Sequence, residues 1–589
     1  MLSRLWLPDP EPRSRGGFRQ RALAAQVETQ DAKISLLASR LLLSWASGTT
    51  SAVQLVDTMR DAVADGLKHI MVVRIANVPR DQHSHEGVMG IIRRRTAVFD
   101  DIRVIDGAVN DAPCHILLPS VIFRTLHQHY PQEFIRRLGA DSDRLAEFWR
   151  CFSSGPNKQW VRRHPILQTL SREQLALTIP LCIHEDAGPI TKKSSANCIS
   201  IAGLLGSGNE KLTHWLCSTY IKKKKGEIDN TAMWNALIAD LEALSSGEIG
   251  GSIVAPVGGT DSLQKWRFVC LFAKADEQVR CDEWKLIHYN GAPFCCSECF
   301  ANRSTIPWTD MRRGARWRQS ESMDAEIYKG RCHAPLHPLI SSKLFWRLFC
   351  VLDIMHILDC KGMSSTIYGS ALGMLLHEEV RLGTSQVARM QQINFKMQLW
   401  YSTRPGTYRL PNLSIASLTS ARGWYELGGP AIKAANTKAA AGFIHSLAVD
   451  YMDDGSETST AVRKLTSSLV SMYSVLDRAG MFLSNTELEQ FREHVHEWGI
   501  SLQFLRAWAE GAGSLYFQVR PKAHKVLHLP MVAATINPNY VSNYACESQI
   551  GTTTLVWKGS VSGRYKRSVQ KTVLAKRWLA VLLRYERGE

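Results

Sequence analysis

The sequence predicts an α/β protein in which a mixed β-sheet core is interrupted by a large, mainly helical insertion and preceded by a mainly helical region. Two short apolar runs, residues 175–183 and 267–274, have the length and composition of buried strands, and acidic residues follow each of them. Residues 340–510 have helical character instead, with an alanine-rich stretch at 431–441 and alternating acidic and basic residues at 487–496. Strands that flank a long helical segment indicate a sheet domain that carries an insertion.

A chain of 589 residues is too long for one ordinary domain, and roughly two to four are expected. Apolar residues at helical spacing support a helical first region, and a third strand is expected at 198–205, before the Gly-Ser-Gly turn at 206–208. The expected segments are a disordered start at 1–20, a mainly helical region at 21–165, the first part of the core at 166–290, the helical insertion at 291–520, and the last part of the core with a basic C-terminal helix at 521–589.

The charge of the chain favours a polyanionic partner. Lys and Arg number 71 against 54 Asp and Glu, which gives a formal net charge of +17, and nucleic acid is the expected partner because phosphate contacts release counterions. The 14 cysteines are scattered, which is typical of a reducing compartment. No run of 18 apolar residues occurs and the N-terminus has no apolar core, so neither a membrane span nor a signal peptide is expected.

Three acidic residues are candidates for a divalent-metal centre. Asp186 and Asp276 each come at the end of a predicted strand, and Glu547 lies in a predicted helix at 540–556. Ligands gather at the carboxyl ends of strands in open α/β sheets, and Mg²⁺ prefers carboxylate oxygens. Each aspartate could instead cap the turn or helix that follows it, because Asp is a favoured capping residue. The pattern therefore predicts a centre for two Mg²⁺ or Mn²⁺ ions, with capping as the alternative role.

Two pairs of cysteine and histidine predict a structural zinc site. Cys296 and Cys299 have the Cys-x2-Cys spacing of a zinc half-site, and His524 and His528 are one helical turn apart. Together they make a Cys2His2 set, which is a closed tetrahedral site rather than a catalytic one. The alternative donors in the same long segment are Cys295, Cys332, His333 and His337.

The order of the candidate ligands carries a family resemblance. Along the chain it is Asp186, Asp276, Cys296-x2-Cys299, a long helical segment, His524-x3-His528 and Glu547. This order resembles the catalytic core of the DDE-type DNA transposases with a zinc-bearing insertion, such as the CACTA-type and Transib elements and the related recombination-activating recombinase. The local sequence of six segments also looks like that of the Kyakuja–Dileera–Zisupton group. These segments are residues 183–189, 296–304, 307–310, 352–356, 521–524 and 543–547. The resemblance covers roughly residues 170–589.

The resemblance implies a ribonuclease-H-like sheet core with a zinc-stapled helical insertion. Asp186, Asp276 and Glu547 would bind two Mg²⁺ or Mn²⁺ ions, and water and then a DNA 3′ hydroxyl would be the nucleophiles. Zinc would hold the insertion on the core without taking part in the chemistry. The implied protein is a nuclear transposase of a transposable element that acts on double-stranded DNA, both element ends and target. A homodimer is one option for its assembly, and residues 21–165 are the place for DNA-end binding.

Two features depart from the family pattern. Glu185 stands beside Asp186 and could replace or repel it, whereas related sequences often place a glycine next to the acid. Asp353 and His356 form an additional Asp-x-x-His element, which could contribute a metal ligand or join helices as a satisfied polar pair. The apolar residues around this element, 348–358, are expected to form a buried helix.

Three basic groups are candidates for contacts with DNA. Lys222, Lys223, Lys224 and Lys225 could follow a phosphate backbone or form a solvated loop. Four arginines interleaved with Trp308 and Trp317 combine phosphate donors with aromatic faces. These arginines are Arg312, Arg313, Arg316 and Arg318. The third group is the amphipathic C-terminal helix, with Lys566, Arg567 and Lys571 and, further along, Lys576 and Arg577.

The sequence leaves four functional classes to distinguish. The first is a metal-dependent DNA strand transferase, and the second is a catalytically inactive, transposon-derived DNA-binding or scaffold protein. The third is a nuclease of the same fold, and the fourth is a zinc-stabilised helical protein without a nucleic-acid role. The three expected acids are present, which favours an enzyme, and the charge of +17 argues against the fourth class.

Overall fold

The computed structural model describes residues 36–589 except 68, 82–83, 96, 110–111, 193, 224–228, 248–265, 287–293, 322, 420–422 and 561–568. The chain forms two compact units. Unit 1 comprises Met1–Ala146, Leu170–Leu271 and Ala545–Glu589, and unit 2 comprises Glu147–Thr169 and Phe272–Tyr544. The predicted disordered segment, 1–20, lies outside the described residues. In the part of the chain that is described, no helix is long and apolar enough to cross a membrane.

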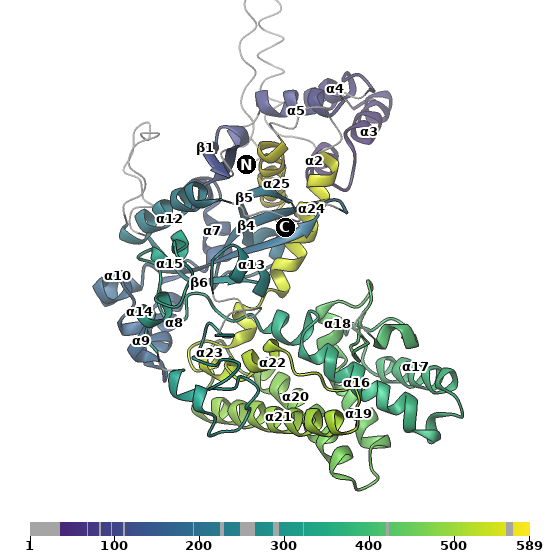
Figure 1. Cartoon of the computed structure of the whole chain (residues 1–589). Helices are drawn as coiled ribbons and strands as arrows, with labels where there is room; N and C mark the ends of the chain where they lie inside the picture. The colour runs from purple at the N-terminus through teal and green to yellow at the C-terminus, as the bar shows by residue number, and fades with distance from the viewer. Residues whose placement is uncertain are drawn as a thin grey trace, which may run out of the picture. The chain divides into compact units, whose positions relative to one another are not determined.

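A six-stranded mixed sheet lies at the centre of unit 1 (Figure 1), which confirms the predicted α/β class. The strand order is β1-β2-β5-β4-β3-β6, and the first four pairings are antiparallel. The amide of Arg267 donates to the carbonyl of Leu177 at 3.0 Å, so β6 and β3 start side by side and run in the same direction. The strands are β1 (Ile102–Val109), β2 (Ala112–Leu117), β3 (Thr178–Pro189), β4 (Ser194–Gly203), β5 (His214–Lys223) and β6 (Arg267–Ala275).

The strands β3 and β6 form where the apolar runs predict them, because both are buried along nearly their whole length. The end of strand β3 at residue 183, which the apolar run predicts, is wrong. Strand β3 continues to Pro189, and Asp186 pairs with Cys198 inside an antiparallel hairpin with β4. Pairing with a second strand satisfies the backbone of this polar segment, so its acidic residues do not end the strand.

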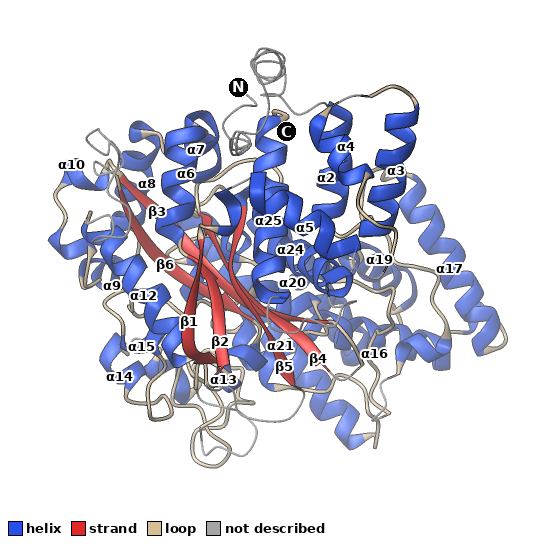
Figure 2. Ribbon diagram, turned by 90° about the horizontal axis from the view of Figure 1, so that it is seen from above, coloured by secondary structure: helices blue, strands red, loops and turns tan. Residues whose placement is uncertain are grey.

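Helices cover both faces of the sheet in unit 1. Figure 2 shows α24 and α25 on one side of the strands and α6 and α12 on the other. Helix α25 contacts β2 and β5, and the indole of Trp557 on α24 donates to Thr219 Oγ1 at 2.7 Å. The helices of unit 1 are α2 (Leu36–Ala46), α3 (Ala52–Ala64), α4 (Ile70–Ala76), α5 (Ser84–Arg95), α6 (Pro119–His129), α7 (Pro131–Leu138), α10 (Arg172–Leu175), α11 (Glu210–Thr213), α12 (Thr231–Ser246), α24 (Tyr544–Ser560) and α25 (Val569–Glu586).

The C-terminal helix differs from the exposed, basic helix that its sequence predicts. In α25 both Lys576 and Arg577 are 3% exposed, because the helix packs against the sheet on one side and α2 on another. The ammonium group of Lys576 lies 4.2 Å from the centre of the Trp45 ring, and burial lowers its pKa to about 7. These two cations are therefore part of the core of unit 1 rather than a surface for DNA.

Unit 2 is mainly helical, and its two longest helices, α20 and α21, pack against each other. Residues 348–358 do not form the predicted helix, because Cys350 makes a parallel bridge with Ala273 of β6 and a π-helical turn follows at Met355–Asp359. The helices of unit 2 are α9 (Lys158–Arg162), α13 (Glu277–Asp282), α14 (Ala325–Lys329), α15 (Pro338–Ser341), α16 (Met363–Glu378), α17 (Gln386–Ser402), α18 (Ala434–Ala439), α19 (Ala441–Tyr451), α20 (Glu457–Arg478), α21 (Asn485–Gly511), α22 (Pro521–Val526) and α23 (Leu529–Ala533); α8 (Ser142–Ser154) spans the boundary.

Candidate metal centres

Unit 1 brings together two of the three predicted acids. Asp186 projects from β3 and Glu547 from the first turn of α24, and their carboxylate oxygens lie within 4.8 Å of each other. The Asp186 residue is 7% exposed, whereas Glu547 is open to solvent. Two carboxylates at this separation repel each other unless a cation or proton lies between them, and hard oxygen ligands of this kind suit Mg²⁺ or Mn²⁺.

A glycine on β3 allows α24 to approach the strand this closely. A Cβ atom at Gly188 would lie 2.4 Å from Thr554 Cγ2 and 2.7 Å from Ile550 Cγ2, both on α24. Ile550 is three residues after Glu547 and therefore lies on the same side of α24. The close contact of Ile550 with Gly188 thus also sets the distance between the Glu547 carboxylate and strand β3. Gly188, two positions after Asp186, therefore has a packing role.

We expect Gly188→Ala to destabilise unit 1 by about 1–3 kcal/mol, because the new methyl group forces α24 away from β3. The change would be measured by urea or thermal denaturation. Gly551→Ala is the matched control, because Gly551 also belongs to α24 and a Cβ there meets nothing within 4 Å. Adding a methyl group at this helical position should stabilise by up to about 1 kcal/mol. Equal destabilisation by the two changes would contradict the packing role of Gly188.

Glu185 does not take the place of Asp186. Successive side chains of a strand point to opposite faces, and Glu185 points to the face opposite Asp186. There its Oε1 accepts hydrogen bonds from Asn197 Nδ2 at 2.7 Å and from the phenol of Tyr220 at 3.1 Å. The side chain is completely buried, so its role is to satisfy a polar cluster inside unit 1.

Asp276 occupies the position that the sequence predicts, directly after β6, but it belongs to unit 2. It is the N-cap of α13, and its Oδ1 accepts a hydrogen bond from the amide of Val279 at 2.7 Å. The capping role considered for this residue is therefore present. Because a carboxylate has two oxygens, a cap through one of them leaves the other able to bind a metal ion.

Within unit 2 the structure brings together the four predicted zinc ligands, Cys296, Cys299, His524 and His528, with their ligand atoms within 4.8 Å of one another. Cys299 Sγ lies 3.1 Å from His524 Nε2, and Cys296 Sγ lies 3.5 Å from His528 Nε2. Zinc bonds of about 2.0–2.3 Å place tetrahedral ligands about 3.5 Å apart, so the set fits a zinc ion. All four residues are buried, as in a closed structural site.

The surroundings of the two histidines orient them toward this centre. His524 Nδ1 donates to the carbonyl of Trp308 and His528 Nδ1 donates to the carboxylate of Glu321, both at 2.9 Å. Since Nδ1 carries the proton in each ring, Nε2 keeps its lone pair for a metal. His524 lies in α22 and His528 in the turn that precedes α23.

The two sulfurs are also prepared as ligands. The amide of Glu298 donates to Cys296 Sγ at 3.3 Å, and the amide of Ala301 donates to Cys299 Sγ at 3.4 Å. Burial raises the pKa of the Cys296 thiol, but its hydrogen bond with Cys299 and the neighbouring histidines lower it well below the ordinary value. The pKa of Cys299 is raised by burial and by its partner sulfur.

The alternative zinc donors lie in other contacts. Cys295 Sγ is 3.5 Å from the carbonyl of Ala301, and Cys332 Sγ is 3.5 Å from the carbonyl of Tyr328. His337 Nδ1 accepts from the amide of Leu339 as the N-cap of α15. None of the alternative donors, His333 included, is in the group of four that the described residues form.

One residue of the zinc region has a role that the sequence reasoning missed. Glu298, which stands between the two cysteines, is 2% exposed and bridges two buried arginines. Its Oε1 is 2.8 Å from Arg280 and its Oε2 is 3.0 Å from Arg347. The signal in the sequence is a carboxylate inside a Cys-x2-Cys turn. By pairing with the two arginines, Glu298 joins that turn to α13 and to the segment before the π-helical turn.

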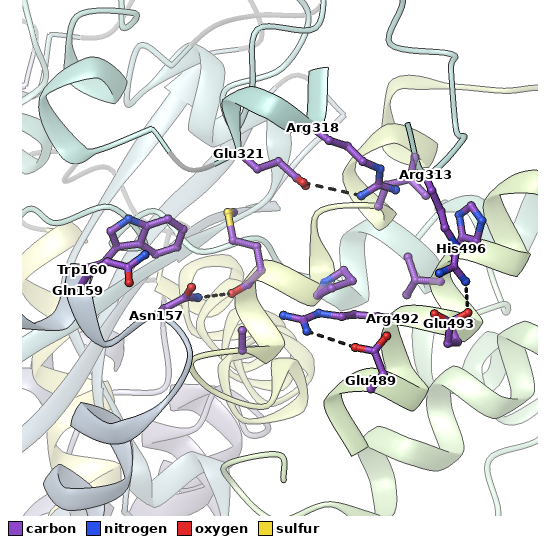
Figure 3. A pocket seen from close by; sticks show the side chains of 15 residues that line it. Asn157, Gln159, Trp160, Arg313, Arg318, Glu321, Glu489, Arg492, Glu493 and His496 are labelled. Carbon is purple, nitrogen blue, oxygen red and sulfur yellow. Dashed lines mark hydrogen bonds and ion pairs between the residues drawn. The ribbon is translucent and has the colours of Figure 1, made fainter. Parts of the chain in front are cut away.

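The predicted arginine patch lies at a cavity of about 380 Å³ in unit 2, next to the zinc region. Figure 3 shows Arg313, Arg318 and Arg492 around this cavity, each beside a glutamate. The Arg313 and Arg492 side chains are 62% and 45% exposed, and such exposed ion pairs hold an arginine weakly. The other two predicted arginines are bonded locally, Arg312 to Asp310 at 2.9 Å and Arg316 to the carbonyl of Thr305 at 3.5 Å.

The aromatic part of that patch is partly unavailable for stacking on bases. Trp317 is fully buried, with its ring centre 4.5 Å from that of His524 and 5.0 Å from that of His528. Its indole donates to the carbonyl of Asp310 at 2.7 Å. Trp317 therefore packs against the two histidines of the candidate zinc site, and Trp308 is half-buried.

The lysine candidates are described only in part. Lys222 and Lys223 end β5, and Lys222 is half-buried, as is Lys571 on α25. The predictions for Lys224, Lys225, Lys566 and Arg567 lie outside the described residues.

Asp353 and His356 form the satisfied polar pair that the sequence leaves as one option. Asp353 Oδ2 lies 2.5 Å from His356 Nδ1, and Oδ1 accepts from the amides of Met355 at 3.2 Å and Asn543 at 3.0 Å. Asp353 is 3% exposed. Because its carboxylate accepts from the amide of Asn543, it lies buried beside the start of α24.

A second buried carboxylate, Asp359, lies six residues further on. Its oxygens accept hydrogen bonds from the phenols of Tyr473 and Tyr544. Burial is the largest influence and raises the pKa of Asp359 to about 7, while the two phenols and Lys438 lower it. Tyr368 also faces this carboxylate, from α16.

This raised pKa predicts a pH dependence of stability. The unfolded carboxyl has a pKa of about 3.9, so between pH 4 and 7 the folded state holds a proton that the unfolded state has lost. The contribution of Asp359 to the free energy of unfolding is therefore at its maximum below about pH 4. It falls by about 4 kcal/mol as the pH rises from there through 7. Urea denaturation of the wild type and Asp359→Asn from pH 5 to 8 should show the variant gaining relative stability as pH rises. Parallel curves would contradict the expectation.

Comparison with known proteins identifies no relative for this chain: no protein-family model and no curated protein matches it.

Proposed function

We propose that the chain is a DNA transposase, or a protein derived from one, that cleaves and joins DNA phosphodiesters with divalent metal ions. The observation that carries this proposal is the pair Asp186–Glu547. These residues are 361 positions apart in the sequence, and their carboxylate oxygens lie within 4.8 Å. A strand-borne aspartate and a helix-borne glutamate are the ligands that the family resemblance implies.

The order of the strands supports a ribonuclease-H-like core. Three consecutive strands, β3, β4 and β5, form an antiparallel meander, and β6 lies on the other side of β3 and runs parallel to it. Asp186 lies in strand β3, and Asp276 directly follows strand β6. Because the carboxyl ends of parallel neighbours lie at one edge of a sheet, we propose Asp276 as the third ligand.

In this proposal the three carboxylates bind two Mg²⁺ or Mn²⁺ ions. When bound, such ions polarise a phosphate and activate the attacking hydroxyl. The role of the protein is to hold oxygen ligands in a fixed geometry. Asp186 would do so from a paired strand, Glu547 from a helix packed at Gly188, and Asp276 through the oxygen that does not cap α13. Water and then a DNA 3′ hydroxyl are the proposed nucleophiles.

The Cys2His2 set is proposed as a structural zinc site. It joins a turn at 296–299 to α22, which are more than 220 residues apart, and no position in it is open to a substrate because all four ligands are buried. The cavity with Arg313, Arg318 and Arg492 is the proposed contact for the DNA backbone. Double-stranded DNA and a nuclear location follow from the same proposal.

A catalytically inactive, transposon-derived DNA-binding or scaffold protein is the second candidate. One observation favours it: Asp276 already has a structural role as the N-cap of α13. A residue that is retained for capping would persist after loss of catalysis.

Cleavage of labelled duplex DNA tests the two candidates. The purified protein would be incubated with Mg²⁺ or Mn²⁺ and duplexes from the genomic flanks that contain the element ends, and compared with Asp276→Asn. The matched control is Asp282→Asn, an exposed carboxylate at the other end of α13.

Metal-dependent nicking that Asp276→Asn abolishes and Asp282→Asn leaves unchanged would support the enzyme and its third ligand. Binding of the duplexes without cleavage by any of the three proteins would support the inactive DNA-binding protein. Nicking that persists in Asp276→Asn would contradict Asp276 as a ligand.

A further inference from the structure

Two buried carboxylates hold the start of α24, the helix that carries Glu547; one contacts Asn543, which precedes the helix, and the other contacts Tyr544, its first residue. The amide of Asn543 donates to Asp353 Oδ1 at 3.0 Å, and the phenol of Tyr544 donates to Asp359 Oδ2 at 2.5 Å. The two aspartates are 3% and 2% exposed. Hydrogen bonds in a buried site restrict the donor to one position, so these two contacts hold the start of α24.

The segment that supplies both aspartates is itself tied into unit 2. It contains the π-helical turn Met355–Asp359, a form of helix that is often found at functional positions. The other oxygen of Asp359 accepts from Tyr473 on α20, whose phenol lies 3.0 Å from Ser364 Oγ on α16. Through Asp359, the start of α24 is thus connected to two long helices.

Lys438 adds a cation to the same cluster. Its ammonium group lies 5.4 Å from the centre of the Tyr473 ring and 5.9 Å from that of Tyr544, and it is ion-paired with Asp477 at 2.7 Å. Asn539, which precedes α24, donates to the same Asp477 at 2.8 Å. The polar contacts on this side of α24 therefore form one connected network, and connected networks of this kind are rigid.

We propose that Asp359 and Tyr544 are positioning residues for Glu547, acting through the first turn of α24. The metal-binding role of Glu547 in this statement rests on the proposed function. Tyr544 and Glu547 are three residues apart and so lie on one side of the helix. Metal ligands need to be held within about 0.5 Å of their working geometry, and a helix fixed at its first residue meets this demand better than a frayed one.

The role is distinct from core packing. Neither Asp359 nor Tyr544 belongs to the metal pair, and both lie in unit 2, whereas Glu547 and Asp186 lie in unit 1. Loss of the Tyr544 phenol should loosen the helix start while leaving both metal-binding carboxylates in the chain. Loss of the Tyr473 phenol removes a hydrogen bond to the same carboxylate without touching α24.

The test compares Tyr544→Phe with Tyr473→Phe in the full-length chain. Mn²⁺ affinity would be measured by electron paramagnetic resonance, with Asp186→Asn as the reference for loss of the pair. Hydrogen–deuterium exchange of amides 545–550 would be measured on the same proteins. Tyr544→Phe should weaken Mn²⁺ binding by about 10-fold or more and speed exchange at 545–550, whereas Tyr473→Phe should change the affinity by less than about 3-fold.

Equal loss of Mn²⁺ affinity in both phenylalanine variants, or in neither, would overturn the positioning role. A wild type whose Mn²⁺ binding is the same as that of Asp186→Asn would instead overturn the proposed metal centre. In that event hydrogen–deuterium exchange alone tests whether Tyr544 and Asp359 anchor the start of α24. Unchanged exchange at 545–550 in Tyr544→Phe overturns this anchoring, and faster exchange in that variant alone supports it.

Discussion

Replacing Cys299 with serine is expected to reduce the zinc content of the protein from about one ion per chain to near zero and to destabilise unit 2 severely. Cys299 Sγ lies 3.1 Å from His524 Nε2, and the cluster connects a turn to a helix 225 residues away. Structural zinc contributes about 10–16 kcal/mol in small zinc domains, so even a third of that would lower the unfolding temperature by roughly 10 °C or more. Zinc would be measured by mass spectrometry and unfolding by calorimetry.

The neighbouring cysteine provides the control. Cys295 is buried like Cys299, but its sulfur contacts the carbonyl of Ala301 rather than the cluster. A serine at 295 keeps a donor for that carbonyl, so Cys295→Ser should retain the zinc of the wild type. Loss of zinc in both variants, or zinc-free wild-type protein, would contradict the assignment of the four ligands.

Glu547→Gln is expected to reduce metal-dependent DNA cleavage by at least about 100-fold. Substitution of residues that only support metal ligands already costs about 10–100-fold, and Glu547 is proposed as a ligand itself. An amide also lacks the charge that draws a second cation beside Asp186. The effect should appear as a fall in both the cleavage rate and Mn²⁺ affinity, while duplex binding without metal is retained.

An exposed glutamate elsewhere in unit 1 serves as the comparison. Glu210 lies in the first turn of α11 and is open to solvent, so Glu210→Gln removes the same charge away from the pair. It should cleave DNA at the wild-type rate. Cleavage by Glu547→Gln at a rate similar to Glu210→Gln would show that Glu547 is not a metal ligand.

The fold was predictable where burial controls the sequence. Strands β3 and β6 are continuous apolar runs because both of their faces are covered, and that pattern is visible without a structure. The extent of β3 was not predictable, since residues 184–189 begin with three polar residues and end with Gly-Pro, and only pairing with β4 keeps them in the strand. Charge taken alone predicts that Lys576 and Arg577 are exposed, whereas the packing of α25 buries them.

The two candidate metal centres were predictable to different degrees. The spacing of Cys296, Cys299, His524 and His528 was sufficient to select four residues that the structure brings together, because few residue types bind zinc. For the acids, spacing had little force among 54 Asp and Glu, and the family resemblance selected Asp186 and Glu547. The anchoring of α24 by Asp359 was beyond prediction, since it depends on a phenol and a carboxylate 185 residues apart meeting inside unit 2.

The long sequence separation between Asp186 and Glu547 has a consequence for biosynthesis. Asp186 emerges from the ribosome 361 residues before the glutamate that faces it, and the whole of residues 272–544 is translated in between. Domains generally fold as units while the chain grows, so the sheet strands wait for their last helix until unit 2 has been made. A nascent chain that has not yet reached residue 547 therefore contains Asp186 without the carboxylate that faces it.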